Sequence, residues 1–222
     1  MTNELGYRII DYEDCDSYTT VIFVPGSWEI GNNQRNSAAS DAIIRQCIAN
    51  TLFYESTRDW DALDTAATRE DWIGAFDGKT FQSELADLKA VIDQERKEPN
   101  IGKIYLSGSS YGGALAIMAS DLVDGMLLAA PQISCNPGEN PPNIYQDFPT
   151  LETLGQKLAA FQGPLSIVHG QEDNVIPIDS SFEAYMLATG TRDKRFTIIP
   201  GNHTFTDNLT GYAREHLHFL RR

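Results

Sequence analysis

Residues 103–118 read Lys-Ile-Tyr-Leu-Ser-Gly-Ser-Ser-Tyr-Gly-Gly-Ala-Leu-Ala-Ile-Met. The first five are typical of a strand and the last five favour a helix, so the Gly-Ser-Ser-Tyr-Gly turn joins a strand directly to a helix. The Gly-x-Ser-x-Gly pattern needs its glycines because the backbone there is strained and closely packed, with no room for a Cβ on either side of the serine. Such a turn, a nucleophile elbow, holds the Ser110 hydroxyl out from the sheet at the positive end of a helix. Ser110 is therefore the candidate nucleophile.

Two later segments contain the acid and the base that such a serine needs. Residues 166–177 read Ser-Ile-Val-His-Gly-Gln-Glu-Asp-Asn-Val-Ile-Pro, and residues 199–205 read Ile-Pro-Gly-Asn-His-Thr-Phe. His203 follows a strand-like run and can accept the serine proton, while a neighbouring carboxylate orients its imidazole. Glu172 and Asp173 are adjacent, and either could do so. The order along the chain is serine, acid, histidine.

In this order the three segments resemble the α/β-hydrolase superfamily, and the matching elements run from about residue 20 to the C-terminus. The resemblance implies an α/β fold, with a mostly parallel central sheet of about six to seven strands and helices on both faces. It also implies a triad of Ser110, Asp173 and His203, because the His-Gly-x-x-Asp-x-x-x-Pro spacing puts the acid of similar sequences at Asp173 and leaves Glu172 solvated. His169 of the same motif has a structural role in similar sequences, where it holds a turn.

The resemblance also implies an oxyanion hole, in which two backbone amides face the oxygen that becomes negative in the tetrahedral intermediate. One amide is expected from Tyr111, the residue after the candidate nucleophile. The other is expected from Ser27, in the loop that follows the strand-like residues 20–24. Similar hydrolases usually have His-Gly in this loop, so Pro25 is a departure. Because the donor is a backbone group, the identity of the side chain matters little.

Short apolar runs alternate with longer helical patterns, which predicts βαβ units and one domain over residues 1–222. Strands are expected near residues 7–12, 20–24, 51–55, 103–107, 125–130, 165–169 and 195–199. Helices are expected near residues 37–49, 80–97, 112–121, 150–160, 179–189 and 209–220. One strand candidate precedes residues 20–24, where many similar proteins have two, so we expect a reduced N-terminal edge. His216 and His218 lie in the terminal helix pattern and are expected at the surface or in an interface.

The chain has 222 residues and a formal net charge of -14, with acidic residues spread along it. This charge disfavours nucleic acid and anionic membranes as partners. The N-terminus has no basic segment followed by an apolar stretch, and no apolar run could span a bilayer, so we expect no membrane insertion and a cytoplasmic location. Cys15, Cys47 and Cys135 are unevenly spaced and are expected to be free thiols. Residue spacing suggests neither a metal site nor an organic cofactor.

Two irregular segments follow the carboxyl ends of expected strands, where ligands bind in open α/β sheets. The segment from Ser56 to Gly78 contains Trp60, Trp72 and Phe76. It favours an amphipathic surface segment whose aromatic residues point inward, or else a lid that makes a deep apolar pocket. The segment from 132 to 148 is rich in Pro, Asn and Gly and lies where larger relatives insert a cap domain, so we expect a minimal cap.

The resemblance implies a serine hydrolase without metal or cofactor. Cleavage of a carboxylic ester of a small or medium substrate, through an acyl-Ser110 intermediate, is the commonest activity for these groups on a bare domain. A thioesterase or an amidase would use the same groups, whereas a non-catalytic binding protein generally loses one of them. Trp28, Trp60 and Trp72 are candidate walls of the pocket for a small-molecule acyl substrate, although Trp28 suits a buried core nearly as well. The natural substrate and the oligomeric state stay open.

Overall fold

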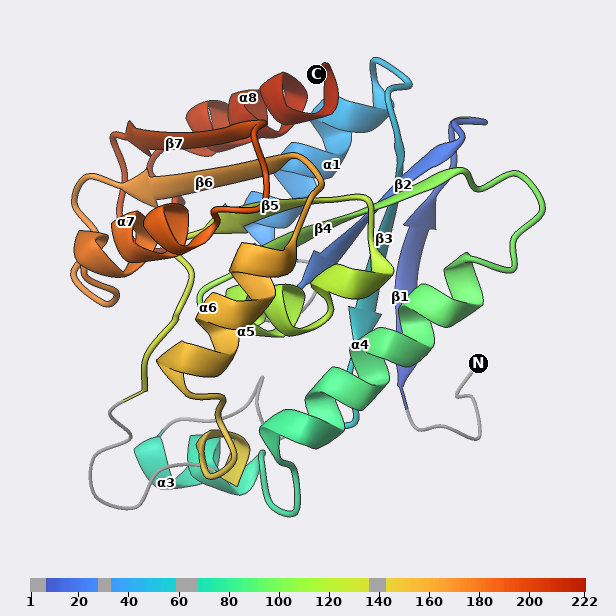
Figure 1. Ribbon diagram of the computed structural model, residues 1–222. Helices are drawn as coiled ribbons and strands as arrows, with labels where there is room; N and C mark the ends of the chain where they lie inside the picture. The colour runs from blue at the N-terminus through green and yellow to red at the C-terminus, as the bar shows by residue number, and fades with distance from the viewer. Residues whose placement is uncertain (1–6, 28–32, 59–67, 136–142) are drawn as a thin grey trace.

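A seven-stranded sheet forms the centre of the computed structural model, which describes residues 7–27, 33–58, 68–135 and 143–222 (Figure 1). Its strands are β1 (Arg8–Glu13), β2 (Thr19–Val24), β3 (Asn50–Glu55), β4 (Lys103–Ser109), β5 (Gly125–Ala129), β6 (Leu165–Gly170) and β7 (Lys194–Ile199). They lie in the order β1-β3-β2-β4-β5-β6-β7, and every neighbouring pair is parallel except β1 with β3. All seven predicted strands are present, which confirms the predicted mostly parallel sheet. Among the described residues, β1 alone precedes β2, so the reduced N-terminal edge is confirmed too.

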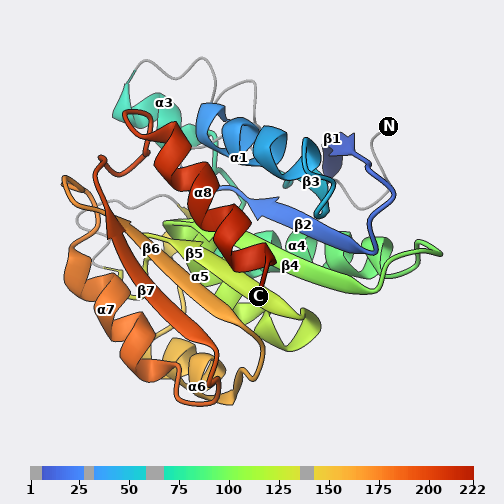
Figure 2. The same cartoon turned by 90° about the horizontal axis from the view of Figure 1, so that it is seen from above.

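Two layers of helices cover the sheet. The elements outside the sheet are α1 (Gln34–Ile44), α3 (Arg69–Gly74), α4 (Phe81–Glu95), α5 (Tyr111–Met118), η1 (Ser120–Leu122), η2 (Asn143–Tyr145), α6 (Leu151–Ala160), α7 (Ile178–Leu187) and α8 (Leu209–Leu220). In Figure 1 and Figure 2, α1 and α8 lie side by side on one face, and α4, α5, α6 and α7 lie on the other. Helices on both faces of the sheet were expected from the sequence.

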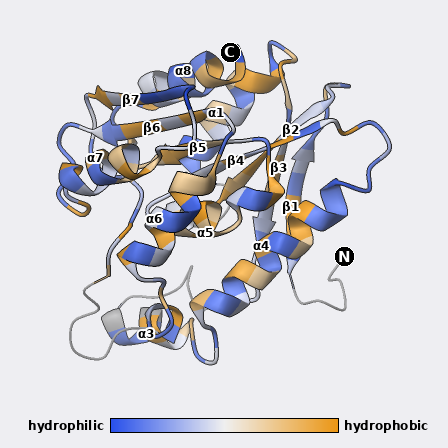
Figure 3. Ribbon diagram, viewed as in Figure 1, coloured by the Kyte–Doolittle hydropathy of each residue, from blue (hydrophilic) through white to orange (hydrophobic). Residues whose placement is uncertain are grey.

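The two faces of the sheet belong to two hydrophobic cores. Along β2, Val21 and Phe23 contribute to the core under α1 and α8, whereas Ile22 and Val24 contribute to the core under α4 to α7. Successive side chains of a strand point to opposite faces, so a strand covered on both sides is rich in apolar residues on both faces. In Figure 3 the central strands are largely hydrophobic, while α4 carries hydrophobic and hydrophilic residues along its length. This burial is what holds the carboxyl ends of the strands in fixed positions.

The first predicted helix is shifted toward the N-terminus. It was expected near residues 37–49 but spans 34–44, because the Asn33 side chain caps it by accepting from the Asn36 amide. Cys47 has a φ of 45°, a left-handed conformation that cannot continue a helix. Cys15, Cys47 and Cys135 all carry free thiols, as predicted.

His216 is not at the surface, and that prediction was wrong. The side chain is 1% exposed, on the face of α8 that packs against the sheet, and its ring stacks on Phe23. Nδ1 lies 3.1 Å from the Tyr212 carbonyl and must donate to it, so Nε2 accepts from the Ser107 hydroxyl at 2.8 Å. Burial lowers the pKa of His216 to about 4. His218 is 45% exposed at its side chain and is the surface residue that was expected.

The buried His216 should make the protein less stable in acid. Because its pKa falls from 6.5 to about 4 on folding, the unfolded chain binds a proton more readily in that range. The free energy of unfolding should therefore decrease as the pH falls from 6.5 toward 4, by up to roughly 3 kcal/mol from this residue. Urea unfolding of wild type and His216→Gln at several pH values gives the free energy of unfolding as a function of pH, and this dependence should be weaker in the variant. His218→Gln is the control and should keep the wild-type dependence. An unchanged pH dependence in His216→Gln would contradict the prediction that the buried His216 destabilises the protein in acid.

Candidate active site

Ser110 occupies a strained turn between β4 and α5. Its φ of 51° and ψ of -120° lie outside the regions that residues with a side chain normally adopt. A Cβ on Gly108 would lie 2.6 Å from the Gly112 carbonyl oxygen, and a Cβ on Gly112 would lie 2.4 Å from the Val24 carbonyl oxygen. The Ser110 amide donates to the Ala129 carbonyl at 2.9 Å, which ties the turn to β5. Both glycines are therefore required sterically, as the sequence pattern suggested.

Asp173 and His203 meet at the same edge of the sheet. Asp173 lies in the loop after β6 and His203 in the loop after β7, and the two strands are parallel neighbours. The Nδ1 of His203 lies 2.7 Å from Oδ2 of Asp173. The Asp173 side chain is 0% exposed and that of His203 is 14% exposed. The structure thus brings these two predicted site residues together, with the imidazole between the carboxylate and the solvent.

The Asp173 carboxylate is held in its ionised form. Its Oδ1 accepts from the amides of Val175 and Ile176 at 2.8 and 3.0 Å. Burial alone would raise the pKa of Asp173, but the hydrogen bonds from His203 and from these two amides lower it below the ordinary value. A buried carboxylate that stays charged fixes the imidazole tautomer, since Nδ1 must carry the proton. Nε2 of His203 is then left to accept a proton.

Glu172 and His169 have other roles in the same loop. Glu172 is exposed, as expected, but its Oε2 also accepts from the Gly201 amide at 2.6 Å, and its own amide donates to the Gly201 carbonyl at 3.0 Å. It therefore fixes the loop that carries His203, and it does not contact the imidazole ring in any described hydrogen bond. His169 is buried at the end of β6, where its Nδ1 lies 2.7 Å from the Ser181 hydroxyl. Burial lowers the pKa of His169, so it supports the loop as a neutral side chain.

A cavity of about 450 Å³ joins the candidate nucleophile to the candidate base. Its lining residues are Gly26, Ser27, Ser110, Gln132, Tyr145, Val175, Ile176, His203 and Thr204. Asp173 lies behind His203 and does not line it. The lining comes from loops after β2, β4, β5, β6 and β7, the carboxyl edge where open α/β sheets bind ligands.

One of the two expected oxyanion residues lines this cavity, and the other directly follows the lining residue Ser110 in the chain. Ser27 lines it from the loop after β2, and Tyr111 is the first residue of α5, directly after Ser110. Within the part of the chain that the structure describes, the amides of Ser27 and Tyr111 have no hydrogen-bond acceptor. Unpaired amides at a helix N-terminus and in a loop can donate hydrogen bonds to an incoming oxyanion.

Comparisons with known proteins agree with this architecture. No family model and no curated protein sequence matches the chain. Among solved structures, Est1E from Butyrivibrio proteoclasticus superimposes with a TM-score of 0.71 at 15% identity, covering 97% of this chain and 98% of its own. The chain has the α/β-hydrolase fold. An esterase from Pyrococcus furiosus has a TM-score of 0.70 at 15% identity, covering 97% and 92%. A lidless serine hydrolase from Xanthomonas campestris has a TM-score of 0.64 at 18% identity, covering 97% and 88%.

Within this α/β-hydrolase fold, the cap is small where the structure describes it. The described part of segment 132–148 contains the single turn η2. Asp147 accepts from the Phe81 and Gln82 amides at the start of α4, and Tyr145 and Phe148 pack against Tyr111. Tyr145 and Gln132, which also lines the cavity, are site residues that the sequence reading missed. The only local signal for Tyr145 was the aromatic pair spaced three apart, 145 and 148, just after a proline-rich loop.

The structure does not describe the side chains of the three tryptophans that were predicted to line the pocket. Trp28 and Trp60 lie outside the described residues, and Trp72 lies in α3, where its side chain is not described. Phe76 is 0% exposed in the core, with its ring beside the Arg58 guanidinium, as the inward-facing alternative predicts. Whether the rest of segment 56–78 forms a lid stays a prediction.

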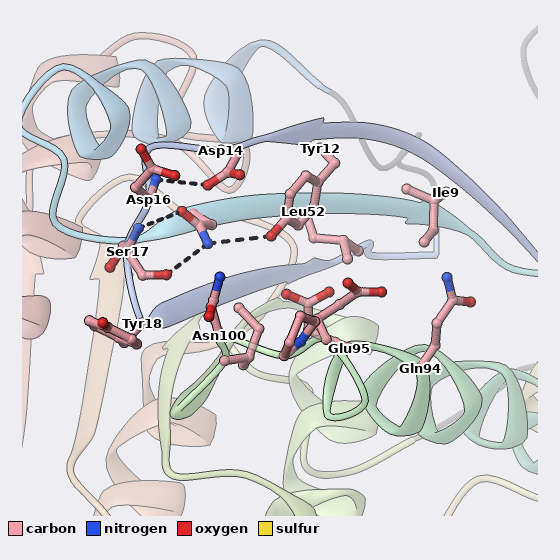
Figure 4. A pocket seen from close by; sticks show the side chains of 14 residues that line it. Ile9, Tyr12, Asp14, Asp16, Ser17, Tyr18, Leu52, Gln94, Glu95 and Asn100 are labelled. Atoms are coloured by element: carbon pink, nitrogen blue, oxygen red, sulfur yellow. Dashed lines mark hydrogen bonds between the residues drawn. The ribbon is translucent and has the colours of Figure 1, made fainter.

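A second cavity of about 520 Å³ lies at the opposite, amino end of the parallel strands, between β1 and the end of α4 (Figure 4). It is the larger of the two, but its lining includes neither histidine nor cysteine, and its charged groups are the carboxylates of Asp14, Asp16, Glu95 and Glu98. It therefore holds no nucleophile and base pair of the kind found beside Ser110.

Among the described residues, no three His, Cys, Asp or Glu side chains are grouped as metal ligands. No described helix has both the length and the apolar character to cross a bilayer.

Proposed function

We propose that this chain is a serine hydrolase that cleaves carboxylic esters of small or medium substrates through an acyl-Ser110 intermediate. The observation that carries the proposal is the cavity shared by Ser110 and His203, with His203 hydrogen-bonded through Nδ1 to the buried Asp173. This gives a nucleophile on a strained turn, a base whose Nε2 has no hydrogen-bond partner among the described residues, and an ionised group behind it.

In the proposed reaction, Ser110 Oγ attacks the carbonyl carbon of the ester while Nε2 of His203 takes the hydroxyl proton. The amides of Ser27 and Tyr111 donate hydrogen bonds to the carbonyl oxygen as it becomes negatively charged. The tetrahedral intermediate then collapses: the carbon–oxygen bond to the leaving alcohol breaks, and protonated His203 delivers its proton to that oxygen. Water, deprotonated by the same nitrogen, attacks the acyl-enzyme, and the carboxylic acid leaves with Ser110 restored.

The structural neighbours favour ester hydrolysis over other acyl transfers. One neighbour is an esterase, another is a dienelactone hydrolase from Anabaena variabilis, and Est1E has been crystallised with ferulic acid bound. A thioesterase or amidase uses the same groups and stays the alternative, since it differs only in the leaving group. The cytoplasmic location, the single domain and the small-molecule partner also stay predictions.

Hydrolysis of a panel tests the proposal. Wild type and Ser110→Ala are assayed on p-nitrophenyl esters, acyl thioesters and peptide amides. Highest kcat/KM on the esters, abolished by Ser110→Ala, supports the proposal. Highest kcat/KM on thioesters or amides supports the alternative, and absence of turnover on all three supports a binding protein.

Short acyl esters should be better substrates than long ones. The described cap is one turn over the cavity and offers little apolar wall, and remote parts of a substrate contribute to catalysis only where something contacts them. The net charge of -14 should also slow encounter with polyanionic acyl-CoA, an effect that salt relieves because exposed charges are screened over about 10 Å at 0.1 M. A series from acetate to laurate esters, with an acyl-CoA at low and moderate salt, measures both. A maximum at octanoate or longer, or fast acyl-CoA cleavage indifferent to salt, contradicts this prediction.

A further inference from the structure

A fully buried ion pair lies directly behind the candidate oxyanion loop. The Arg58 side chain, which follows β3, is 0% exposed, and Glu84 in the first turn of α4 is 1% exposed. Nε of Arg58 lies 2.9 Å from both carboxylate oxygens of Glu84, and Nη2 lies 2.8 Å from Oε2. Burial opposes a charge on Arg58, but Glu84 outweighs it and raises the pKa of Arg58 above its ordinary value. Arg58 is therefore a permanent buried cation.

A contribution to stability does not by itself explain why this buried ion pair is present. Removing two charges from water has a large free-energy cost, and replacing a buried ion pair by apolar side chains of similar volume is often neutral or stabilising. Arg58 also has a donor that Glu84 does not use. Its Nη1 donates to the Gly26 carbonyl at 2.8 Å and approaches the Ser27 carbonyl at 3.4 Å.

The Gly26 carbonyl and the Ser27 amide belong to the same peptide unit. The described peptide bonds are all trans, so the C=O and the N–H of that planar unit point in opposite directions. With the carbonyl directed at Arg58 in the interior, the Ser27 N–H is directed away from Arg58, and both residues of this peptide unit line the cavity. A cation on the carbonyl oxygen also polarises the peptide and strengthens the N–H as a donor.

The same guanidinium contacts the other expected donor residue. Its central carbon lies 5.7 Å from the centre of the Tyr111 ring and 5.3 Å from that of Phe76. Arg58 thus touches the Gly26–Ser27 loop through a hydrogen bond and Tyr111 through its ring. One planar group therefore contacts both of the residues or loops from which the oxyanion donors are expected.

We propose that Arg58 is a positioning residue for the oxyanion hole: it orients the Gly26–Ser27 peptide so that the Ser27 amide faces the substrate oxygen, and it holds this loop against Tyr111. Being fully buried, it acts through the peptide and does not touch substrate. This inference rests on the proposed function. A lysine could not replace Arg58 fully, because one ammonium cannot make the fork to Glu84 and also reach the Gly26 carbonyl.

The test compares Arg58→Lys and Arg58→Met with wild type on the best ester of the panel. Loss of an oxyanion donor typically lowers kcat by about 10²–10³-fold, so displacement of one should lower kcat by roughly 10- to 100-fold, less for Lys than for Met. KM should change by less than about 3-fold, because the donor acts in the transition state and not on bound substrate. The inhibition constant of a trifluoromethyl ketone, whose adduct carries an oxyanion, should increase by the factor by which kcat falls.

Thr57→Ala is the matched control. Thr57 donates through its hydroxyl to Asp87 at 3.0 Å, so the variant loosens the same segment without touching Gly26. It should lose stability but keep kcat and the ketone affinity. Thermal unfolding establishes that each variant is folded; if Arg58→Met does not fold, Arg58→Lys still gives the kcat and ketone readouts.

Two failures are distinguishable. If wild type shows no turnover that depends on Ser110, the proposed function and this inference both fall. If Ser110-dependent turnover exists but folded Arg58→Lys keeps the wild-type kcat and ketone affinity, only the positioning role is contradicted. The same holds if Thr57→Ala lowers kcat and ketone affinity as much as Arg58→Lys does.

Discussion

Replacing Ser110 with alanine should leave a folded protein whose kcat is lower by roughly 10⁴ to 10⁶, because the members of a triad act as a unit. Ser110 lies in a turn with a φ of 51°, and alanine can occupy it at no greater steric cost than serine. The hydroxyl removed is the only part of the side chain that the proposed reaction uses. Loss of activity should therefore occur without loss of stability.

A fluorophosphonate probe followed by peptide mapping measures this directly. The probe should label Ser110 in wild type and should not label Ser110→Ala. Ser109 is a neighbouring control, since its buried hydroxyl has no hydrogen-bond partner among the described residues and plays no part in the proposed reaction. Labelling of another serine, or equal labelling of the alanine variant, would show that Ser110 is not the nucleophile.

Asp173→Asn should lower kcat by roughly 10³- to 10⁴-fold, whereas Glu172→Gln should change it little. The Oδ1 of Asp173 accepts from two amides, so the asparagine carbonyl would take that place and turn its NH₂ group toward His203. Nδ1 of His203 would then have to accept, which moves the ring proton to Nε2. An Nε2 that already carries a proton cannot take one from Ser110.

Glu172→Gln is the matched control, one residue away. Glutamine keeps a carbonyl oxygen that can accept from the Gly201 amide, the one side-chain hydrogen bond described for Glu172. The loop of His203 should therefore stay in place. Steady-state kinetics of both variants on one ester give the ranking, and the reverse ranking would show that Glu172 is the acid.

Much of the fold could be predicted from the sequence because its signals are local. The run that became β5, Gly-Met-Leu-Leu-Ala, is buried at every residue, and such continuous apolar runs are typical of parallel strands covered on both faces. The helix spanning 34–44 was misplaced by a few residues, since a cap by Asn33 and a left-handed Cys47 leave only weak traces in the sequence.

The candidate site, like the fold, has parts that local sequence signals predict and parts that they do not. Gly108, Ser110 and Gly112 could be found from the sequence, because a strained turn between a strand and a helix needs particular residue types at particular spacings. His203 and the acidic pair were found from their motifs as well. Whether Glu172 or Asp173 faces the imidazole depends on the orientation of two side chains, which spacing along the chain does not define.

The sequence by itself determined the strand and helix order, the sharp turn at Ser110 and the candidate acid and base, because backbone geometry and hydrophobic periodicity act over a few residues. Only the tertiary structure decided which groups are buried and which meet. It put His216 against Ser107, 109 residues away, and Arg58 against Gly26, 32 residues away. Burial and hydrogen bonding between distant segments depend on how the layers pack, and that packing assembled the cavity in which Ser110 and His203 lie together.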